Sequence, residues 1–107
     1  MPTQENAVKF ERFIFDLSPL AENAVVVEVD EFNHRASLKN AVGSNSPETV
    51  KRDVSAMYTA WLRMAGAVVQ EGVVVEISPL FADSMEIVAE KIEKGRRFEQ
   101  ATHLWEN

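Results

Sequence analysis

The residues best suited to chemistry gather in one polar stretch, which runs from Asp30 to Asn45. It holds His34, Arg35 and Lys39 among asparagines and serines, and it follows neither a helical nor a strand period. Unstructured stretches of this length inside compact domains are more often functional than not. Lys39 carries a compact charge, which suits contact with a phosphate group at short range. The simpler interpretation is that Lys39 is only a solvated surface charge without a binding role.

Several other chemistries are excluded by the residues present. There are no cysteines, so the chain has no disulfide, no thiolate metal site and no cysteine nucleophile. The two histidines, His34 and His103, do not stand at a metal-ligand spacing, and we expect both to be exposed. None of the four glycines forms a G-x-G arrangement, so neither common phosphate-binding glycine loop occurs. We therefore single out no metal ligand.

Length and composition predict a single partial domain over residues 1–107. The hydrophobic content of 46% is typical of a folded protein. The net charge of −6 repels a nucleic-acid backbone, and no apolar stretch reaches the length of a membrane helix. We therefore expect neither nucleic acid nor a membrane as partner. The N-terminus lacks the basic-then-apolar order of a signal peptide, so the cytoplasm is the expected location.

The first half of the chain predicts a helix followed by a strand. Helical spacing of apolar residues indicates a helix from Gln4 to Leu17, with Thr3 as its N-cap. Pro19 should end it, since the residue before a proline is pushed out of helical geometry. The nearly continuous β-branched run at 24–29 predicts a buried strand, of the kind found in parallel sheets.

The middle of the chain contains the clearest helix, expected from Pro47 to Ala65. Ser46 has the chemistry of an N-cap, and Pro47 would occupy the first helical position, where its missing N–H costs nothing. Apolar residues recur at the helical period through Trp61, which is first of all a core candidate. Gly66 provides the expected stop.

The last part of the chain predicts two strands and a helix. Residues 67–69 and 73–77 are expected to be strands, separated by a tight turn at 70–72. A helix should run from Ser84 to Lys94, with Asp83 and Glu86 forming a capping box and Gly95 closing it. The tail at 96–107 shows no clear period. The order of these elements indicates an α/β fold.

A series of short motifs spans most of the chain. In order, they are KFERFIFD at 9–16, VVEV at 26–29, LKNA at 38–41, SPET at 46–49, W at 61, AG at 65–66 and EISPL at 76–80. Each motif is weak alone, but their order and gaps together are specific. The series resembles the C-terminal portion of the UDP-sugar pyrophosphorylase family, and its first motif resembles the UDP-N-acetylglucosamine branch.

The resemblance implies a fold, a reaction and three site positions. The fold would be the C-terminal segment of a Rossmann-like nucleotidyltransferase, with strands flanked by helices. The parent reaction would join UTP to N-acetylglucosamine 1-phosphate, or to another sugar 1-phosphate, and release pyrophosphate with Mg²⁺ present. Phe13 and Phe15 would shape the sugar side of the pocket. Lys39 would contact the phosphate of the nucleotide sugar and act in catalysis.

Two departures from the family pattern accompany the resemblance. Residues before the family's K-N-A motif usually read F-x-P-[VL], whereas Arg35 stands here in place of the aromatic and Ser37 in place of the proline. Loss of proline loosens a loop in its free state. The G-G-x-G-T-R loop that grips UTP in the family's N-terminal half is absent from these residues. They supply no Mg²⁺ ligand and are expected to be inactive alone.

Different functional classes therefore stay open. In the first class, the chain is a segment of an enzyme and binds a UDP-sugar or sugar 1-phosphate together with the missing catalytic half. In the second class, it is a stand-alone binding module. The second class predicts self-association or partner docking, because removal of the other half would bare apolar surface. A remnant without function is a third reading. Phe13 and Phe15 could equally be plain core, and they share a face only if they lie on a strand.

Overall fold

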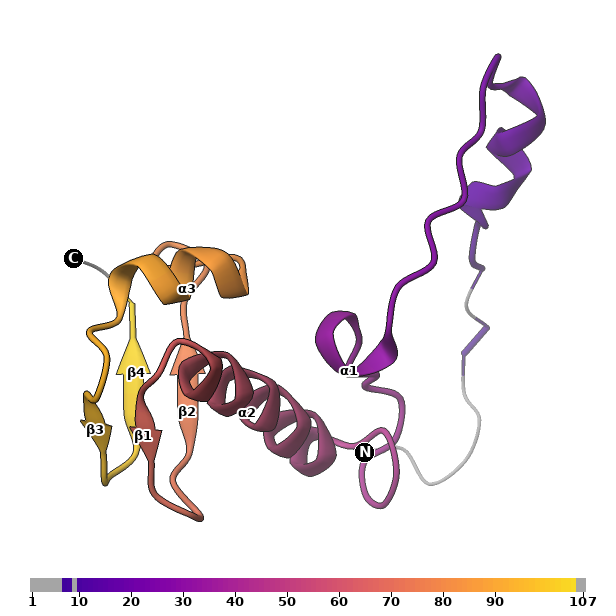
Figure 1. The fold of residues 1–107 in the computed structure, drawn as a ribbon. Coiled ribbons are helices and arrows are strands. Elements are labelled where there is room, and N and C mark those ends of the chain that lie inside the picture. The colour runs from indigo at the N-terminus through magenta and orange to yellow at the C-terminus, as the bar shows by residue number, and fades with distance from the viewer. Residues whose placement is uncertain (1–6, 9, 106–107) are drawn as a thin grey trace.

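The computed structural model describes residues 7–8 and 10–105, which form two contrasting regions (Figure 1). A compact body is formed by residues 46–105. An N-terminal arm, residues 10–30, runs away from it, and residues 31–45 link the two. The Cα radius of gyration is 18.5 Å, well above the roughly 13 Å of a compact chain of this length. The extended arm accounts for this difference.

Helix α2, Pro47–Met64, is the longest element of the body and forms as its sequence predicts. The Ser46 hydroxyl accepts a hydrogen bond from the Thr49 N–H, while the Thr49 hydroxyl binds the Ser46 N–H in return. This reciprocal cap satisfies two of the donors that a helix start leaves unpaired. Gly66 follows the helix with φ +90°, a left-handed conformation that favours glycine.

Two pairs of short parallel strands pack against α2. Strand β1, Val68–Val69, pairs with β3, Arg97–Phe98, and strand β2, Val75–Ile77, pairs with β4, Thr102–Leu104. The predicted turn at 70–72 forms, with the Val73 N–H donating to the Gln70 carbonyl. However, β1 and β2 each pair with a strand from the tail, where no period was recognisable. Strands this short carry too few residues to show one.

Helix α3, Met85–Lys91, covers one side of the core and is shorter than predicted. Its N-cap is Ser84, whose hydroxyl accepts from the Ile87 N–H, so the predicted Asp83–Glu86 capping box is wrong. The helix ends at Lys91 because the next residue, Ile92, adopts extended geometry and turns its side chain into the core.

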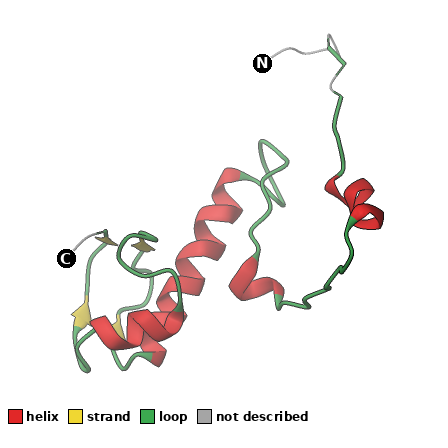
Figure 2. Cartoon of the chain, turned by 90° about the horizontal axis from the view of Figure 1, so that it is seen from above, coloured by secondary structure: helices red, strands yellow, loops and turns green. Residues whose placement is uncertain are grey.

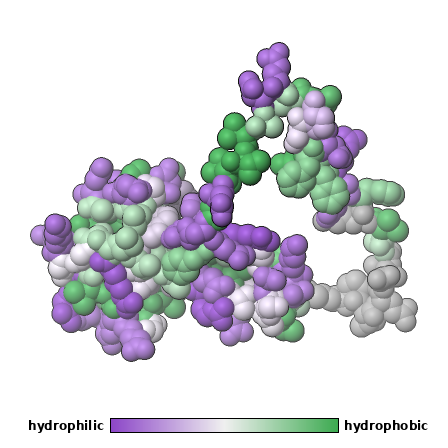
Figure 3. Space-filling model, turned by 45° about the vertical axis from the view of Figure 1, so that its right-hand side comes forward, coloured by the Kyte–Doolittle hydropathy of each residue, from purple (hydrophilic) through white to green (hydrophobic). Residues whose placement is uncertain are grey.

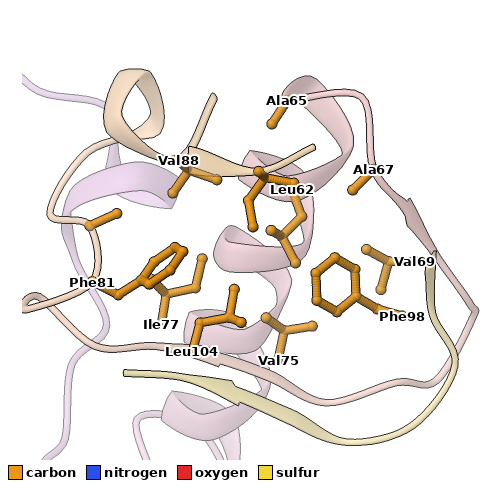
Figure 4. Packing of buried hydrophobic residues seen from close by; sticks show 12 residues of the cluster. Leu62, Ala65, Ala67, Val69, Val75, Ile77, Phe81, Val88, Phe98 and Leu104 are labelled. Carbon is orange, nitrogen blue, oxygen red and sulfur yellow. The ribbon is translucent and has the colours of Figure 1, made fainter. Parts of the chain in front are cut away.

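The core lies between α2, α3 and the inner faces of the strands (Figure 4). Leu62 and Val88 are fully buried, and Val75 and Ile77 are 1% exposed. The wider cluster adds Ala65, Ala67, Val69, Phe81, Ala82, Ile92, Phe98 and Leu104. Trp61 packs partly buried against this cluster, as its spacing predicted. Leu62 is the first cluster member in the sequence, so the body forms its core without the arm.

The arm differs from its predicted structure. Residues 10–13 are not helical; a 3₁₀ helix, η1, spans Ile14–Leu20 and contains Pro19 instead of ending before it. Residues 3–6, the predicted start of the helix, lie outside the described residues. The apolar face of the predicted helix is bare, with Phe10 93% and Ile14 76% exposed. A short helix needs packing on such a face to be stable, and none of the described residues covers it here.

The predicted strand at 24–29 is also wrong for this chain. The segment is neither helix nor strand and pairs with no strand in the described part of the chain, and Val25, Val26 and Val27 are 84%, 95% and 74% exposed. A strand needs a hydrogen-bonded partner, and none of the described strands reaches this segment. The space-filling view shows apolar side chains gathered along the arm (Figure 3). The observed architecture is therefore mixed α/β: the short parallel strand pairs lie in the body, while helices occur in the body, the link and the arm.

Candidate functional site

Lys39 is exposed on a short loop that closes on itself, the Lys39 loop (residues 39–45). The N–H groups of Lys39 and Asn40 both donate to the Asn45 carbonyl, at 2.7 and 2.9 Å. The Asn40 side-chain amide adds a third bond, to the Ser44 carbonyl at 2.8 Å. The lysine is therefore presented to solvent from a hydrogen-bonded loop and is available to an anionic ligand.

Phe13 and Phe15, the other two predicted site residues, lie on the arm at the start of η1. They are 63% and 74% exposed. Phe13 has extended backbone geometry, whereas Phe15 is inside the 3₁₀ helix, so they do not share a strand face. Figures 1 and 2 both show η1 far from the link that carries Lys39. The structure therefore does not bring the two aromatics and the lysine together, and their shared role stays a prediction.

An open cavity of about 470 Å³ lies between the link and α2. Its walls are the segment 31–37, Asn45 and one face of α2. The α2 residues at this wall are Asp53, Val54, Ala56, Met57 and Tyr58. The volume falls within the range of small-molecule sites. Its charged groups are of both signs, so the cavity suits a polar ligand of low net charge better than a strong anion.

Helix α1, Glu31–His34, forms one wall of this cavity within the stretch expected to be a loop. Asp30 caps it by accepting from the Asn33 N–H at 2.9 Å. Hydrogen bonds from the Asn33 backbone and side chain, with a smaller contribution from His34, lower the pKa of the Asp30 carboxyl. The Trp61 indole N–H donates to the Asn33 side-chain oxygen at 3.4 Å, which ties α1 to α2.

The two residues that depart from the family pattern contact each other just before the Lys39 loop. The Arg35 Nε donates to the Ser37 hydroxyl at 3.1 Å, and an Arg35 terminal nitrogen lies 4.0 Å from the Glu31 carboxylate. Arg35 and Glu31 are largely exposed, so this ion pair contributes little to stability. The hydrogen bond gives the segment a local contact where the family has proline.

Both histidines are exposed, as predicted. His34 lies against the Asp30 carbonyl and carboxylate. His103 lies on β4, 3.9 Å from the Glu76 carboxylate on β2, and its ring stacks on Trp105. Burial, followed by the nearby charge of Glu76, raises the pKa of Tyr58. Glu76 and His103 lie on the exposed face of the β2–β4 pair.

Sequence reasoning missed α1 and the cavity that it forms with α2. A signal for α1 was present, since Asp30 is one of the residues favoured at a helix N-cap. The α2 wall of the cavity could not be recognised, because its residues also fit an ordinary amphipathic helix. Among the described residues, no group of three metal-ligating side chains occurs, and none of the helices could span a membrane.

Comparison with known proteins places the chain in a family. It is 36% identical over 105 residues to a UDP-N-acetylglucosamine pyrophosphorylase of Saccharomyces cerevisiae, covering 94% of this chain and 21% of that protein. A probable UDP-N-acetylglucosamine pyrophosphorylase of Dictyostelium discoideum is 33% identical over 84 residues, covering 74% and 17%. UDP-N-acetylglucosamine diphosphorylase 2 of Arabidopsis thaliana is 37% identical over 98 residues, covering 85% and 19%. No family model matches the chain.

These matches confirm the resemblance that the motifs indicated. Over most of its length the chain is homologous to proteins of the UDP-sugar pyrophosphorylase family. Within that family, these three relatives all carry the N-acetylglucosamine name. The chain spans about a fifth of the length of the curated relatives that it matches.

Proposed function

We propose that this chain supplies part of the sugar and phosphate pocket of a UDP-sugar pyrophosphorylase. The parent reaction is UTP plus N-acetylglucosamine 1-phosphate giving UDP-N-acetylglucosamine plus pyrophosphate. The observation that carries the proposal is the similarity to UDP-N-acetylglucosamine pyrophosphorylases over 94% of the chain. In the finer version of the proposal, the body and arm are the C-terminal segment of a Rossmann-like nucleotidyltransferase fold.

Lys39 has the electrostatic role in this proposal. A sugar 1-phosphate oxygen attacks the α-phosphorus of UTP, and negative charge develops on the phosphate oxygens as pyrophosphate leaves. A lysine nitrogen about 4 Å from such an oxygen contributes on the order of 4 kcal/mol at a surface-like dielectric, before desolvation costs. The exposed position of Lys39 on a closed loop supports this role.

Phe13 and Phe15 complete the pocket only if the arm moves onto a larger protein. Both rings are mostly exposed in this chain, on a segment rich in bare apolar side chains. Burying a valine or phenylalanine stabilises a protein by about 1.5–3 kcal/mol per side chain, so covering the arm would be strongly favourable. The natural cover is the rest of the pyrophosphorylase, which accounts for about four-fifths of each relative's length. We infer that the chain is inactive alone.

Mg²⁺, which the family reaction implies, does not fit the residues described here. No three potential ligands converge among residues 7–8 and 10–105. We therefore assign no metal ligand to this chain and derive no step through the ion.

The test is a chimera in which residues 1–107 replace the matching segment of the Saccharomyces cerevisiae enzyme. Pyrophosphate release from UTP and N-acetylglucosamine 1-phosphate is measured for the chimera and for this chain alone. We expect release only from the chimera. Lys39→Ala should lower its turnover by roughly 10²–10³, the scale seen when one transition-state donor is lost.

Lys51→Ala is the matched control, because Lys51 is also an exposed lysine, on α2. Its turnover should stay within about twofold of the parent chimera. Equal turnover of the Lys39→Ala chimera and its parent would refute the role of Lys39. Pyrophosphate release by the isolated chain would refute the need for a larger protein.

A second function is supported by the exposed arm. A stand-alone nucleotide-sugar-binding or docking module would use the arm to bind a second copy or another subunit. Light scattering over a range of protein concentrations separates this from the first proposal. A concentration-dependent dimer that Val26→Asp abolishes would favour the docking module. A monomer at all concentrations would refute self-association.

A further inference from the structure

The Lys39 loop is closed by one backbone carbonyl. The Asn45 carbonyl accepts from the N–H groups of both Lys39 and Asn40, at 2.7 and 2.9 Å. Both lone-pair positions of that oxygen are therefore used on the lysine side of the loop. The Asn40 side chain reinforces the closure through the Ser44 carbonyl at 2.8 Å.

The closing carbonyl is directly attached to the start of α2. Asn45 has φ +53°, a left-handed conformation that asparagine tolerates and β-branched residues strongly disfavour. The next residue, Ser46, is 1% exposed and caps the 18-residue helix through its bonds with Thr49. The left-handed turn therefore aims the Asn45 carbonyl back across the loop while the residue beside it is held rigidly.

The segment before Lys39 offers weaker support. Its local contact is the bond from Arg35 to Ser37, between exposed side chains, at a place where the family pattern has proline. An exposed side-chain bond competes with water and restrains the backbone less than a proline ring does. The bonds that hold the Lys39 and Asn40 amides therefore come from the C-terminal side, where Asn45 adjoins α2.

We propose that Asn45 is the positioning residue for Lys39. Its left-handed backbone directs a carbonyl that fixes the Lys39 amide to the capped start of α2, in place of the missing proline. This inference rests on the proposed function, in which the Lys39 ammonium contacts the phosphate of a nucleotide sugar. Asn45 contributes through its conformation and not through its side chain, so a residue that keeps φ positive should replace it.

The test compares Asn45→Val with Asn45→Gly in the full chain. Both variants lose the same side-chain amide, but only glycine keeps the left-handed conformation freely. Hydrogen exchange of the Lys39 and Asn40 amides should become about tenfold faster in Asn45→Val and stay unchanged in Asn45→Gly. The α2 helix signal in circular dichroism should match in all three proteins, which shows that the body is folded.

The functional readout is turnover of the chimera described above. We expect Asn45→Val to lower turnover about tenfold and Asn45→Gly to restore it, while Lys39→Ala abolishes the difference between the two. Unchanged amide exchange in Asn45→Val overturns the proposal. So does faster exchange with unchanged turnover, which would leave Lys39 catalytic but positioned by another means.

Failure of the proposed function has a different signature. If Lys39→Ala itself leaves turnover unchanged, the lysine has no role to be positioned for, and both inferences fall. Asn40→Ala serves if Asn45→Val does not fold, because it removes the bond to Ser44 without disturbing any φ angle. It should speed exchange of the same two amides, and unchanged exchange would count against the loop closure.

Discussion

Val26 and Val75 allow the division between arm and body to be tested with one chemical change. Val26 is 95% exposed on the arm, whereas Val75 is 1% exposed on β2. Substitution by alanine removes two methyl groups from each. At about 0.8 kcal/mol per buried carbon, the Val75→Ala change loses about 1.6 kcal/mol of transfer free energy. An unfilled cavity raises the total to roughly 2–3 kcal/mol.

Val26→Ala should leave the isolated chain within about 0.5 kcal/mol of the parent, as exposed substitutions usually do. The body has about 60 residues, which corresponds to a total stability of roughly 3–9 kcal/mol. The loss caused by Val75→Ala is therefore a large share of the total stability and is easily measured. The assay is urea unfolding followed by tryptophan fluorescence and far-ultraviolet circular dichroism.

In the chimera, Val26 should contribute to stability about as much as Val75 does in the isolated chain. If the arm becomes covered there, Val26→Ala should cost about as much as Val75→Ala costs in the isolated chain. Equal destabilisation by both substitutions in the isolated chain would refute the exposed arm. A Val26→Ala effect that stays within about 0.5 kcal/mol in the chimera would refute the inference that the rest of a pyrophosphorylase covers it.

Two further predictions follow from the caps. Ser46→Ala removes one half of the α2 capping box and should lower the free energy of unfolding by about 1 kcal/mol, measured by urea unfolding. The lowered pKa of Asp30 means that its cap on α1 is intact above the ordinary value of 3.8 and is lost as the pH falls through the lowered pKa. The Asn33 amide resonance should report this transition by NMR, and Asp30→Asn, which still caps, should remove it. A transition that persists in Asp30→Asn would assign it to another group.

Local chemistry predicted most of the body. The α2 helix was identified from Ser46, Pro47 and the apolar period, because caps and periodicity act within a few residues of one another. The same reasoning misplaced the cap of α3 by one residue, since Asp83 and Ser84 both have suitable side chains. Strands β3 and β4 were missed because pairing partners, and not their own two or three residues, make them strands.

The candidate site was predicted less completely. Lys39 was singled out from its motif, and the structure places it exposed on a loop, but its role in a site stays a prediction. The closure of the loop was not predicted, because it depends on the φ angle of Asn45 and on hydrogen bonds that cross the loop. The cavity between α1 and α2 was missed for the same reason, since it joins residues that are far apart in sequence.

The sequence by itself determined the family, the cap of α2, the apolar face of α2 and the residue types available for phosphate contact. Each of these is a property of side chains within short distances along the chain. Only the tertiary structure decided which apolar segments are buried. The valine run at 24–29 has the composition of a buried strand, yet it stays bare because no described strand pairs with it. Burial requires a second surface, and the residues that form this surface lie outside the segment that becomes buried.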